Sequence, residues 1–286
     1  MNRGTLQKIL DYNCGILRCA PTFLSRLRGE SGRHLRLHPN DYDIAGNSSM
    51  INERWFTSTV SAVNDHGTVS EDGMCHINTD DTQEGKILFK EFVDQIQEEL
   101  IGKKVFEKYG TWPVYAKFAD FEDFMFYQGN FVPDSGCCVG EAVAYYYPMQ
   151  YNNYIAKSPY AYFECNLHAE KRNAEKYFCV PVTVRGSEDY VEKKIIYGNP
   201  YLYATELTVF PGREIVITDE TAYGCVVIQG YGRFGMHSCA SPSMLRLGRF
   251  SEDEFFVSDL VAHSGIIIKN LSLYEPLVML KHMPCL

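Results

Sequence analysis

The sequence predicts a mainly β fold, an all-β sandwich or barrel, and residues 203–282 carry most of this prediction. This stretch contains short runs of β-branched and aromatic residues at 206–219, 223–235, 253–259 and 265–282. Turn signals separate the runs, among them Pro211-Gly212 and Ser241-Pro242. No helix-length periodic pattern interrupts them. Short, evenly spaced strands of this kind are typical of β sandwiches and barrels.

Composition supports a folded, packed chain and excludes some partners. Hydrophobic residues make up 45% and aromatic residues 14% of the 286 positions, which is ample for a β core. The formal net charge of −9 argues against nucleic-acid binding, because affinity for phosphate backbones comes from Lys and Arg. No apolar run reaches the roughly 20 residues of a membrane span. We therefore expect neither nucleic acid nor membrane as a partner.

Cysteine usage and the N-terminus predict a cytoplasmic protein. The ten cysteines show no even framework of the kind found in disulfide-rich secreted domains. Lys8, Asp11 and Arg18 interrupt the apolar stretch that a signal peptide would need. Residues 1–38 are basic, with seven Lys or Arg against two acidic residues. This arm packs on the acidic body or, alternatively, holds an anionic ligand.

Elements before residue 203 are mixed. Residues 5–17 have the spacing of a short amphipathic helix. The four-residue recurrence of Leu88, Phe92, Ile96 and Leu100 predicts one long amphipathic helix, which Asp81-x-x-Glu84 would cap. From residue 112 the period becomes two, predicting strands at 112–118 and 124–127. We divide the chain into an N-terminal α+β segment (1–110), a first region (111–196) and a C-terminal β domain (197–286).

Several of these features resemble the cupin superfamily. Pro211-Gly212 follows a strand run, Gln229-Gly230-Tyr231-Gly232 is expected to close a hairpin, and Asn270 precedes Glu275-Pro276-Leu277-Val278. The stretches 112–120 and 141–148 look like a first cupin half. Together they resemble bicupins similar to class I mannose-6-phosphate isomerases. The resemblance implies a double-stranded β-helix, or jelly roll, with two cupin-like halves, of which the first is shortened.

The second half departs from the metal-binding cupin pattern. Cupins hold their metal through an H-x-H pair after the Pro-Gly strand and a third His before the closing Asn. Those positions fall here near Thr218, Glu220 and Ile266, and His263 is displaced by three residues. A metal site needs three or four suitable ligands. We therefore expect no metal in the C-terminal cupin.

The first half is the catalytic one by resemblance. Isomerases of this kind place a zinc-ligating Glu in Lys-Pro-Glu, and Glu141 would be that residue, although Val139-Gly140 replace Lys-Pro. No His lies between His76 and His168. Cys165-x-x-His168 offers metal-ligand residue types at close spacing, with packing or surface use as the alternative. If these residues hold a divalent metal such as zinc, that metal is the cofactor of the first half.

A basic segment offers a substrate site. Its alternation would place Arg36 and His38 on one strand face, and Arg33 lies just before them. Arginine binds phosphate or carboxylate through two parallel hydrogen bonds. These residues are our candidates for holding a sugar or a sugar phosphate. The alternative is a solvated edge strand.

Two functions follow as alternatives. The chain is a cupin resembling metal-dependent sugar or sugar-phosphate isomerases, or a metal-free cupin acting as a small-molecule binding or assembly module. A third, weaker alternative is a metal-dependent dioxygenase, which needs the same metal ligands. We expect a homodimer formed through strand faces. Gly230-x-Gly232-x-x-Gly235 lies between strands, so it is not a dinucleotide-binding loop.

Overall fold

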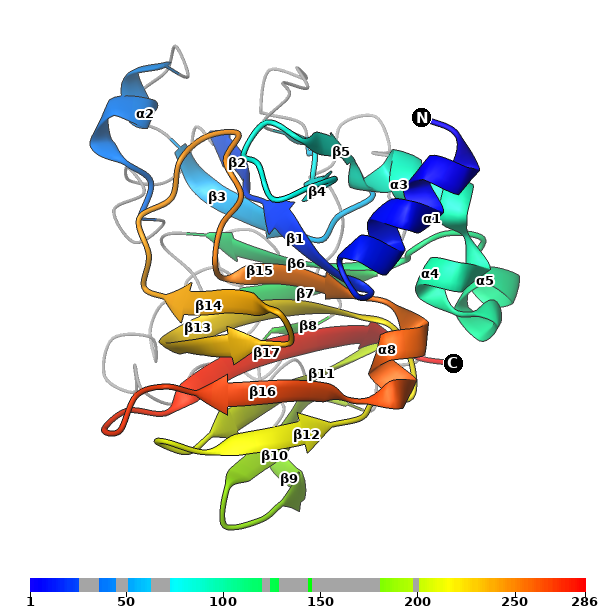
Figure 1. Ribbon diagram of the computed structural model, residues 1–286. Helices are drawn as coiled ribbons and strands as arrows, with labels where there is room; N and C mark the ends of the chain where they lie inside the picture. Colours follow the sequence, from blue (N-terminus) through cyan, green and yellow to red (C-terminus); the bar gives the residue numbers. More distant parts are fainter. Residues whose placement is uncertain are drawn as a thin grey trace, which may run out of the picture.

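The computed structural model describes residues 1–25, 36–44, 51–62, 73–119, 124–128, 144–145, 181–197 and 201–286. These residues form a mainly β protein with two sheets; most of its helices lie on one side of the molecule, and the short helix Pro39–Ile44 lies on the opposite side (Figure 1). The helices are α1 (Arg3–Tyr12), α2 (Pro39–Ile44), α3 (Phe89–Ile96), α4 (Glu98–Ile101), α5 (Lys103–Tyr109) and α8 (Asp259–Ser264). None of the described helices is long and apolar enough to cross a membrane.

The larger sheet runs through the middle of the molecule in the order β5-β4-β1-β15-β13-β17-β11-β10-β9. Strands β12, β14 and β16 branch from it through β13. Its members are β1 (Ile16–Ala20), β4 (His76–Asn78), β5 (Lys86–Leu88), β9 (Val182–Gly186), β10 (Tyr190–Ile196), β11 (Leu202–Val209), β12 (Glu214–Ile217), β13 (Tyr223–Phe234), β14 (His237–Ser241), β15 (Glu254–Val257), β16 (Ile266–Asn270) and β17 (Leu277–Pro284). All the described pairings are antiparallel.

The C-terminal strands wrap into the double-stranded β-helix that the sequence predicts. The first part of β13 pairs with β15 and β17, and its last part pairs with β14 and β16. One strand therefore belongs to both walls of the barrel. Gly230 (φ 86) allows this change, because a Cβ there would lie 2.4 Å from the carbonyl oxygen of Pro276. The hairpin expected at Gly230 in fact turns at Gly235, between β13 and β14.

The turn residues that suggested a cupin meet at one end of this barrel. The Asn270 side chain donates to the carbonyl oxygens of Val209 and Glu275. The Gly212 amide donates to the carbonyl oxygen of Ser272 at 2.7 Å. The Pro211-Gly212 turn is therefore held against the loop that follows β16, although the two are far apart in sequence.

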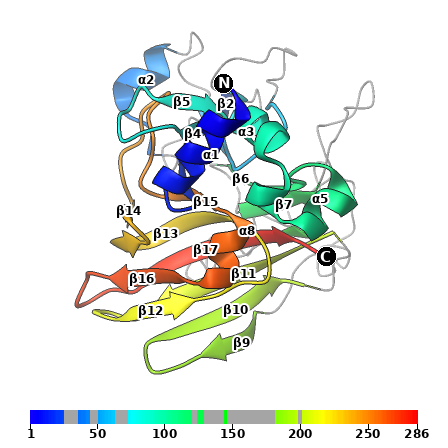
Figure 2. The same ribbon diagram turned by 45° about the vertical axis from the view of Figure 1, so that its right-hand side comes forward.

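A second sheet packs on the other face of the large sheet. Its order is β2-β3-β6-β7-β8, with β2 (Thr22–Ser25), β3 (Ile51–Phe56), β6 (Val114–Ala119), β7 (Phe124–Gln128) and β8 (Ala144–Tyr145). The strands expected at 112–118 and 124–127 are thus confirmed. Phe56, Val114 and Ala116 from this sheet share a core with Leu280 and Phe256 from the large sheet. Figures 1 and 2 show β6 and β7 behind the large sheet.

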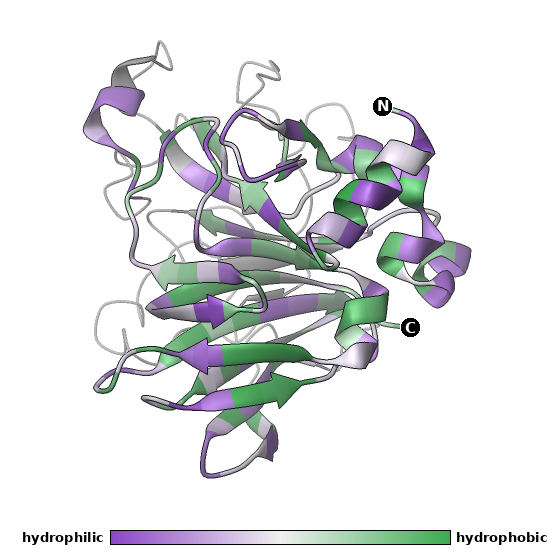
Figure 3. Ribbon diagram, viewed as in Figure 1, coloured by the Kyte–Doolittle hydropathy of each residue, from purple (hydrophilic) through white to green (hydrophobic). Residues whose placement is uncertain are grey.

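The helices beside the N-terminus depart from expectation in one respect. The single long helix expected after Glu84 begins only at Phe89 and is split into α3, α4 and α5. Gln97 (φ 59) and Gly102 (φ 86) leave the helical region, which ends one helix and starts the next. Asp81 and Glu84 lie in the turn between β4 and β5 and cap no helix. Phe92, Ile96 and Leu100 of the apolar stripe are nonetheless buried as predicted, and Leu88 is half-buried. Figure 3 shows apolar and polar residues mixed along these helices.

Two cores result, one on each side of the large sheet. Alternate residues of its strands point to opposite sides: Cys225 and Val227 face the barrel interior, whereas Val226 faces the helices and the second sheet. The barrel core consists of apolar residues from eight strands and one helix: Ile16, Leu207, Val209, Ile215, Ile217, Tyr223, Cys225, Val227, Phe234, Cys239, Phe255, Val257, Ala262, Ile266, Ile268, Leu277, Met279 and Met283.

Candidate functional site

A charged cluster lies inside the C-terminal barrel, among the apolar residues of its core. Lys281 follows Leu277 and Met279 on the inward side of β17, and it is fully buried. Its Nζ atom lies 2.8 Å from Glu192 Oε1 and 2.8 Å from Asp219 Oδ1. We call Lys281, Glu192, Asp219 and Arg185 the barrel ion cluster.

Arg185 and Thr205 complete the hydrogen bonds of this cluster. Arg185 on β9 donates to Glu192, and its Nη2 atom donates to Asp219 Oδ1 at 2.9 Å. The Thr205 hydroxyl donates to Glu192 Oε1 at 2.6 Å. A buried ion pair is tolerated only when the remaining lone pairs and protons are satisfied in this way. The cluster therefore fills this part of the barrel with the chain's own side chains.

The two carboxylates of the cluster respond differently to burial. Burial raises the pKa of Glu192, but Lys281, Thr205 and Arg185 outweigh it, so the pKa lies below the ordinary value. Burial and the neighbouring Glu192 hold the pKa of Asp219 above its ordinary value despite Lys281. Glu192 is thus the firmer partner of the ammonium group, and Asp219 is the carboxylate that protonates first.

The expected ligand positions of the second cupin half need a correction of register. Thr218 and Glu220, which match the expected ligand positions, are both exposed, and Asp219 between them points into the barrel. The reason is strand alternation, since Ile215 and Ile217 of β12 face inward and the next inward position is 219. Ile266 is a core residue, and His263 is exposed on α8. A lysine ammonium thus lies beside the inward carboxylate of this barrel.

A second group of polar side chains lies on the five-stranded sheet. Arg54 and Phe56 of β3 point toward the large sheet. Glu53 and Trp55, the alternate residues of the same strand, therefore point away from it. Lys117 Nζ lies 3.1 Å from Glu53 Oε1, and Trp55 Nε1 donates to Glu53 Oε2 at 3.1 Å. The Trp55 and Tyr115 rings stack with centroids 4.9 Å apart. A buried carboxylate, an ammonium group and an aromatic platform are thus adjacent.

The predicted substrate residues are only partly within the described residues. Arg36 and His38 flank buried Leu37, which forms an isolated bridge with Leu245, and Arg36 has a positive φ of 59°, so these residues form a turn where a strand was expected. Arg36 is exposed and its Nη1 atom donates to Ser241 Oγ at 3.2 Å. The His38 amide donates to the carbonyl oxygen of Leu245. This places both residues beside the loop after β14.

The other predicted site residues, Glu141, Cys165, His168 and Arg33, lie outside the described residues. Of the basic arm, the described Arg3 forms an ion pair with Glu99, and Arg18 lies over the Phe250 ring. These contacts agree with an arm that packs on the body.

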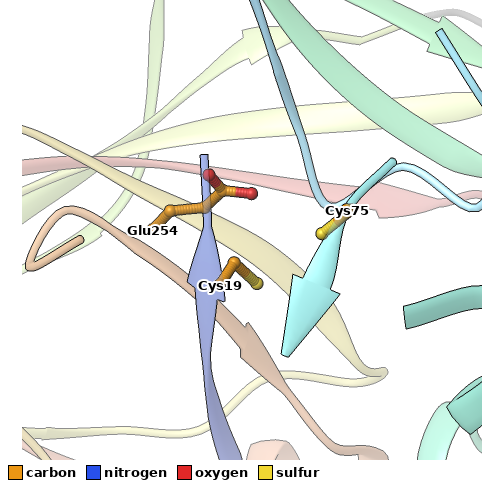
Figure 4. Close-up of side chains that lie close together, drawn as sticks. All are labelled: Cys19, Cys75 and Glu254. Carbon is orange, nitrogen blue, oxygen red and sulfur yellow. The ribbon is translucent and has the colours of Figure 1, made fainter. Parts of the chain in front are cut away.

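A third group has the donor atoms of a metal centre. Cys19, Cys75 and Glu254 each offer one donor atom, and these atoms lie within 4.8 Å of one another. All three residues are buried, and Figure 4 shows their side chains converging from three segments. Within the described part of the chain this is the group in which three ligand-type side chains meet. The prediction of Cys165 and His168 as ligands did not anticipate it.

Electrostatics around this group reflect its burial. Burial raises the pKa of Cys19 well above the usual thiol value. The hydrogen bond from Cys19 lowers the pKa of Cys75, but burial and the Glu254 carboxylate together have the larger effect. The pKa of Cys75 therefore lies above the usual thiol value. Burial also raises the pKa of Glu254 to about 7, although Arg54 lies 3.0 Å from its Oε2 atom. A bound cation would favour the ionised form of all three groups.

Sequence reasoning missed these three groups for a common reason. Lys281 stands in an apolar strand run, and Cys19, Cys75 and Glu254 come from separated segments of the chain. A charged residue at an inward position of a strand was the available signal for Lys281, since buried lysines need partners. Nothing in the spacing of Cys19 and Cys75 indicates that they meet.

Comparisons with known proteins identify the fold. No family model matches the chain, and no curated protein matches it. Among solved structures, zinc-bound mannose 6-phosphate isomerase aligns with a TM-score of 0.51 and 8% identity, over 95% of this chain and 100% of that one. A mutant of phosphomannose isomerase from Salmonella typhimurium gives the same values.

A shorter match covers one part only. An RmlC-like cupin from Shewanella frigidimarina aligns over 36% of this chain and 83% of its own, with 13% identity and a TM-score of 0.26. At 8% identity, the full-length matches show a shared fold. The chain is mainly β and shares its fold with phosphomannose isomerases.

Proposed function

We propose that this chain is a cupin-type isomerase of a sugar or sugar phosphate, with its reaction site in the N-terminal half. The observation that carries the proposal is the alignment of nearly the whole chain with zinc-bound mannose 6-phosphate isomerase. We propose accordingly that the chain contains two cupin-like halves, and that the second sheet (β2-β3-β6-β7-β8) belongs to the first half.

The packed interior of the C-terminal barrel favours a reaction site in the N-terminal half. The inward residues of β11, β13 and β17 pack together, and Lys281 and Glu192 of the barrel ion cluster are buried among them, with Arg185 partly exposed at the edge. A substrate entering there would have to separate Lys281 from two carboxylates, and unpaired buried charges are costly. This barrel therefore serves best as a scaffold.

The N-terminal sheet offers suitable chemistry. Glu53 and Lys117 form a carboxylate–ammonium pair that could move a proton between adjacent carbon atoms or hold a hydroxyl group. The buried Trp55 and Tyr115 rings stack beside this pair, and Trp55 Nε1 donates to Glu53 Oε2 at 3.1 Å. We propose Glu53 and Lys117 as the reacting groups.

We also propose that residues expected from the sequence bind an anion and a metal. Arg33, Arg36 and His38 would bind the phosphate, and Glu141, with Cys165 and His168, would hold a divalent metal. A metal in such a site polarises carbonyl and hydroxyl oxygens of a substrate.

An isomerisation assay tests the proposal. The purified chain, with and without added Zn²⁺, is incubated with mannose 6-phosphate in D₂O and followed by ¹H NMR. We expect formation of fructose 6-phosphate, a fall of at least about 100-fold for K117M, and unchanged activity for K269M, which removes an exposed lysine on β16. No turnover of this or related aldose and ketose phosphates, together with less than a tenth of an equivalent of metal per chain, would refute the proposal.

The second candidate is a metal-free cupin that acts as a binding or assembly module. The barrel ion cluster favours it, because an internal ammonium group, Lys281, takes the partners that a metal or ligand would need. Exposed Val216 and Ile267 on paired strands β12 and β16 would form the face of a homodimer. This candidate predicts a dimer in light scattering and a melting temperature indifferent to chelators. A chelator-induced fall in melting temperature counts against it.

A further inference from the structure

Three neighbouring strands bring two thiols and a carboxylate together on one face of the large sheet. Strand β1 lies between β4 and β15, and it carries Cys19. Glu254 is the first residue of β15, and Cys75 directly precedes β4. Cys19 and Cys75 face the core shared with the second sheet, as does Phe256 two residues after Glu254. The three side chains therefore point to the same side.

The distances suit a small cation. The donor atoms of Cys19, Cys75 and Glu254 lie within 4.8 Å of one another. In a tetrahedral zinc site with thiolate and carboxylate ligands, the donor atoms are about 3.5–3.8 Å apart. Side-chain rotations that move each donor by about 1 Å or less would complete three ligand bonds.

The backbone around the cluster is arranged to stabilise negative charge. The Thr57 amide lies 2.9 Å from Glu254 Oε1. Thr57 has a positive φ of 49°, a conformation that residues other than glycine seldom adopt. The turn after β3 is thus held in an unusual shape that directs a peptide N–H group at the Glu254 carboxylate.

Charge balance points the same way. Arg54 binds both oxygens of Asp253, at 2.7 and 2.8 Å, and also reaches Glu254. One guanidinium group thus serves two buried carboxylates, holding Asp253 with two hydrogen bonds and Glu254 with one. Unbalanced buried charge is unfavourable, and a divalent ion would remove the imbalance.

We propose that Cys19, Cys75 and Glu254 bind a divalent ion of the zinc class. The two sulfur ligands favour a soft or borderline metal over magnesium or calcium. The ion would join β1, β4 and β15, and so tie the N-terminal segments to the C-terminal barrel. Its ligands are unrelated to Glu141 and to the Glu53–Lys117 pair, so this site does not depend on the proposed isomerase activity.

Cobalt(II) substitution tests the site. The full chain is purified under reducing conditions, freed of metal with a chelator, and titrated with Co²⁺ alone. We expect a sulfur-to-cobalt charge-transfer band that saturates at one equivalent, is displaced by Zn²⁺, and accompanies a rise of several degrees in melting temperature. A folded wild-type chain without this band overturns the proposal.

Variants assign the band to these ligands. C19S and C75S should each abolish most of its intensity, whereas C225S and C239S, which alter buried thiols of the barrel core, should leave it intact. Because C19S could misfold, alkylation of the wild type followed by mass spectrometry is the second readout. Metal should protect Cys19 and Cys75 selectively. Retention of the band in C19S, equal protection of all cysteines, or a Cys19–Cys75 disulfide in the reduced preparation overturns the proposal.

Discussion

The Nζ atom of Lys281 lies 2.8 Å from Oδ1 of Asp219, between the walls of the C-terminal barrel. The same atom lies 2.8 Å from Glu192 Oε1. This contact explains how a charged residue can occupy a strand whose other inward positions, Met279 and Met283, are apolar. It also places a fixed positive charge inside the barrel.

Replacement of Lys281 should therefore destabilise the protein strongly. K281M leaves Asp219 and Glu192 buried without their ammonium partner, and removal of one member of a buried pair costs about 3–5 kcal/mol. K269M is the matched control, since Lys269 pairs with Glu214 at the surface and should contribute less than about 1 kcal/mol. Urea unfolding of both variants measures the difference. Equal effects would show that the cluster has no special role.

Glu254 predicts a pH dependence of stability. Its pKa is raised by burial to about 7 in the folded chain, whereas an unfolded glutamate titrates near about 4.3. The folded state therefore binds more protons between these values, and the free energy of unfolding falls as the pH rises through this window. E254Q cannot ionise, so its stability relative to metal-free wild type should improve by on the order of 1–3 kcal/mol from pH 4.5 to 7.5. A constant difference across this range would contradict the assignment.

His282 predicts the opposite slope in acid. Burial lowers its pKa to about 3, and its Nε2 atom lies 2.6 Å from Thr57 Oγ1. The unfolded state binds the extra proton between about pH 6.5 and 3, so stability is lost as the pH falls below about 6.5. H282Q should flatten this acid limb. H263Q, at an exposed position of α8, should behave like wild type. Thermal melts between pH 4 and 7 distinguish the two.

Gly224 permits the close packing of the two sheets. A Cβ at this position would lie 2.2 Å from His282 Nε2 and 2.4 Å from Thr57 Oγ1. G224A should cost about 1–3 kcal/mol or more, because both neighbours must move. G4A provides the control, since Gly4 is exposed in helix α1 and has only a 3.6 Å contact to Asn2. That change should be neutral or stabilising by up to about 1 kcal/mol. Similar melting temperatures for both variants would contradict the packing.

The fold could be predicted where local patterns determine it. Strand alternation and the Pro211-Gly212 and Asn270 turns indicated the C-terminal β-helix, and the period of two indicated β6 and β7. The apolar stripe around Phe92 and Ile96 indicated a helix but not its breaks, because the positive φ of Gln97 depends on tertiary packing. Element boundaries are weakly encoded, so the capping signal at Asp81 was misleading.

The candidate sites could be predicted far less well. The inward position is Asp219, between the expected Thr218 and Glu220, since a one-residue error in strand register reverses every side chain. Cys19, Cys75 and Glu254 come together only after three strands pair, so their proximity depends on long-range topology. Glu53 and Lys117 lie on strands joined by a long connection, and neither carries a motif. A single sequence contains no direct signal for such contacts.

The most direct test of the account is the position of a bound sugar phosphate in a crystal structure of this chain with fructose 6-phosphate. We predict ligand density against the five-stranded sheet, beside Glu53 and Lys117, with Lys281 still bonded to Asp219. Density inside the C-terminal barrel, with Lys281 displaced from Asp219, would contradict the account.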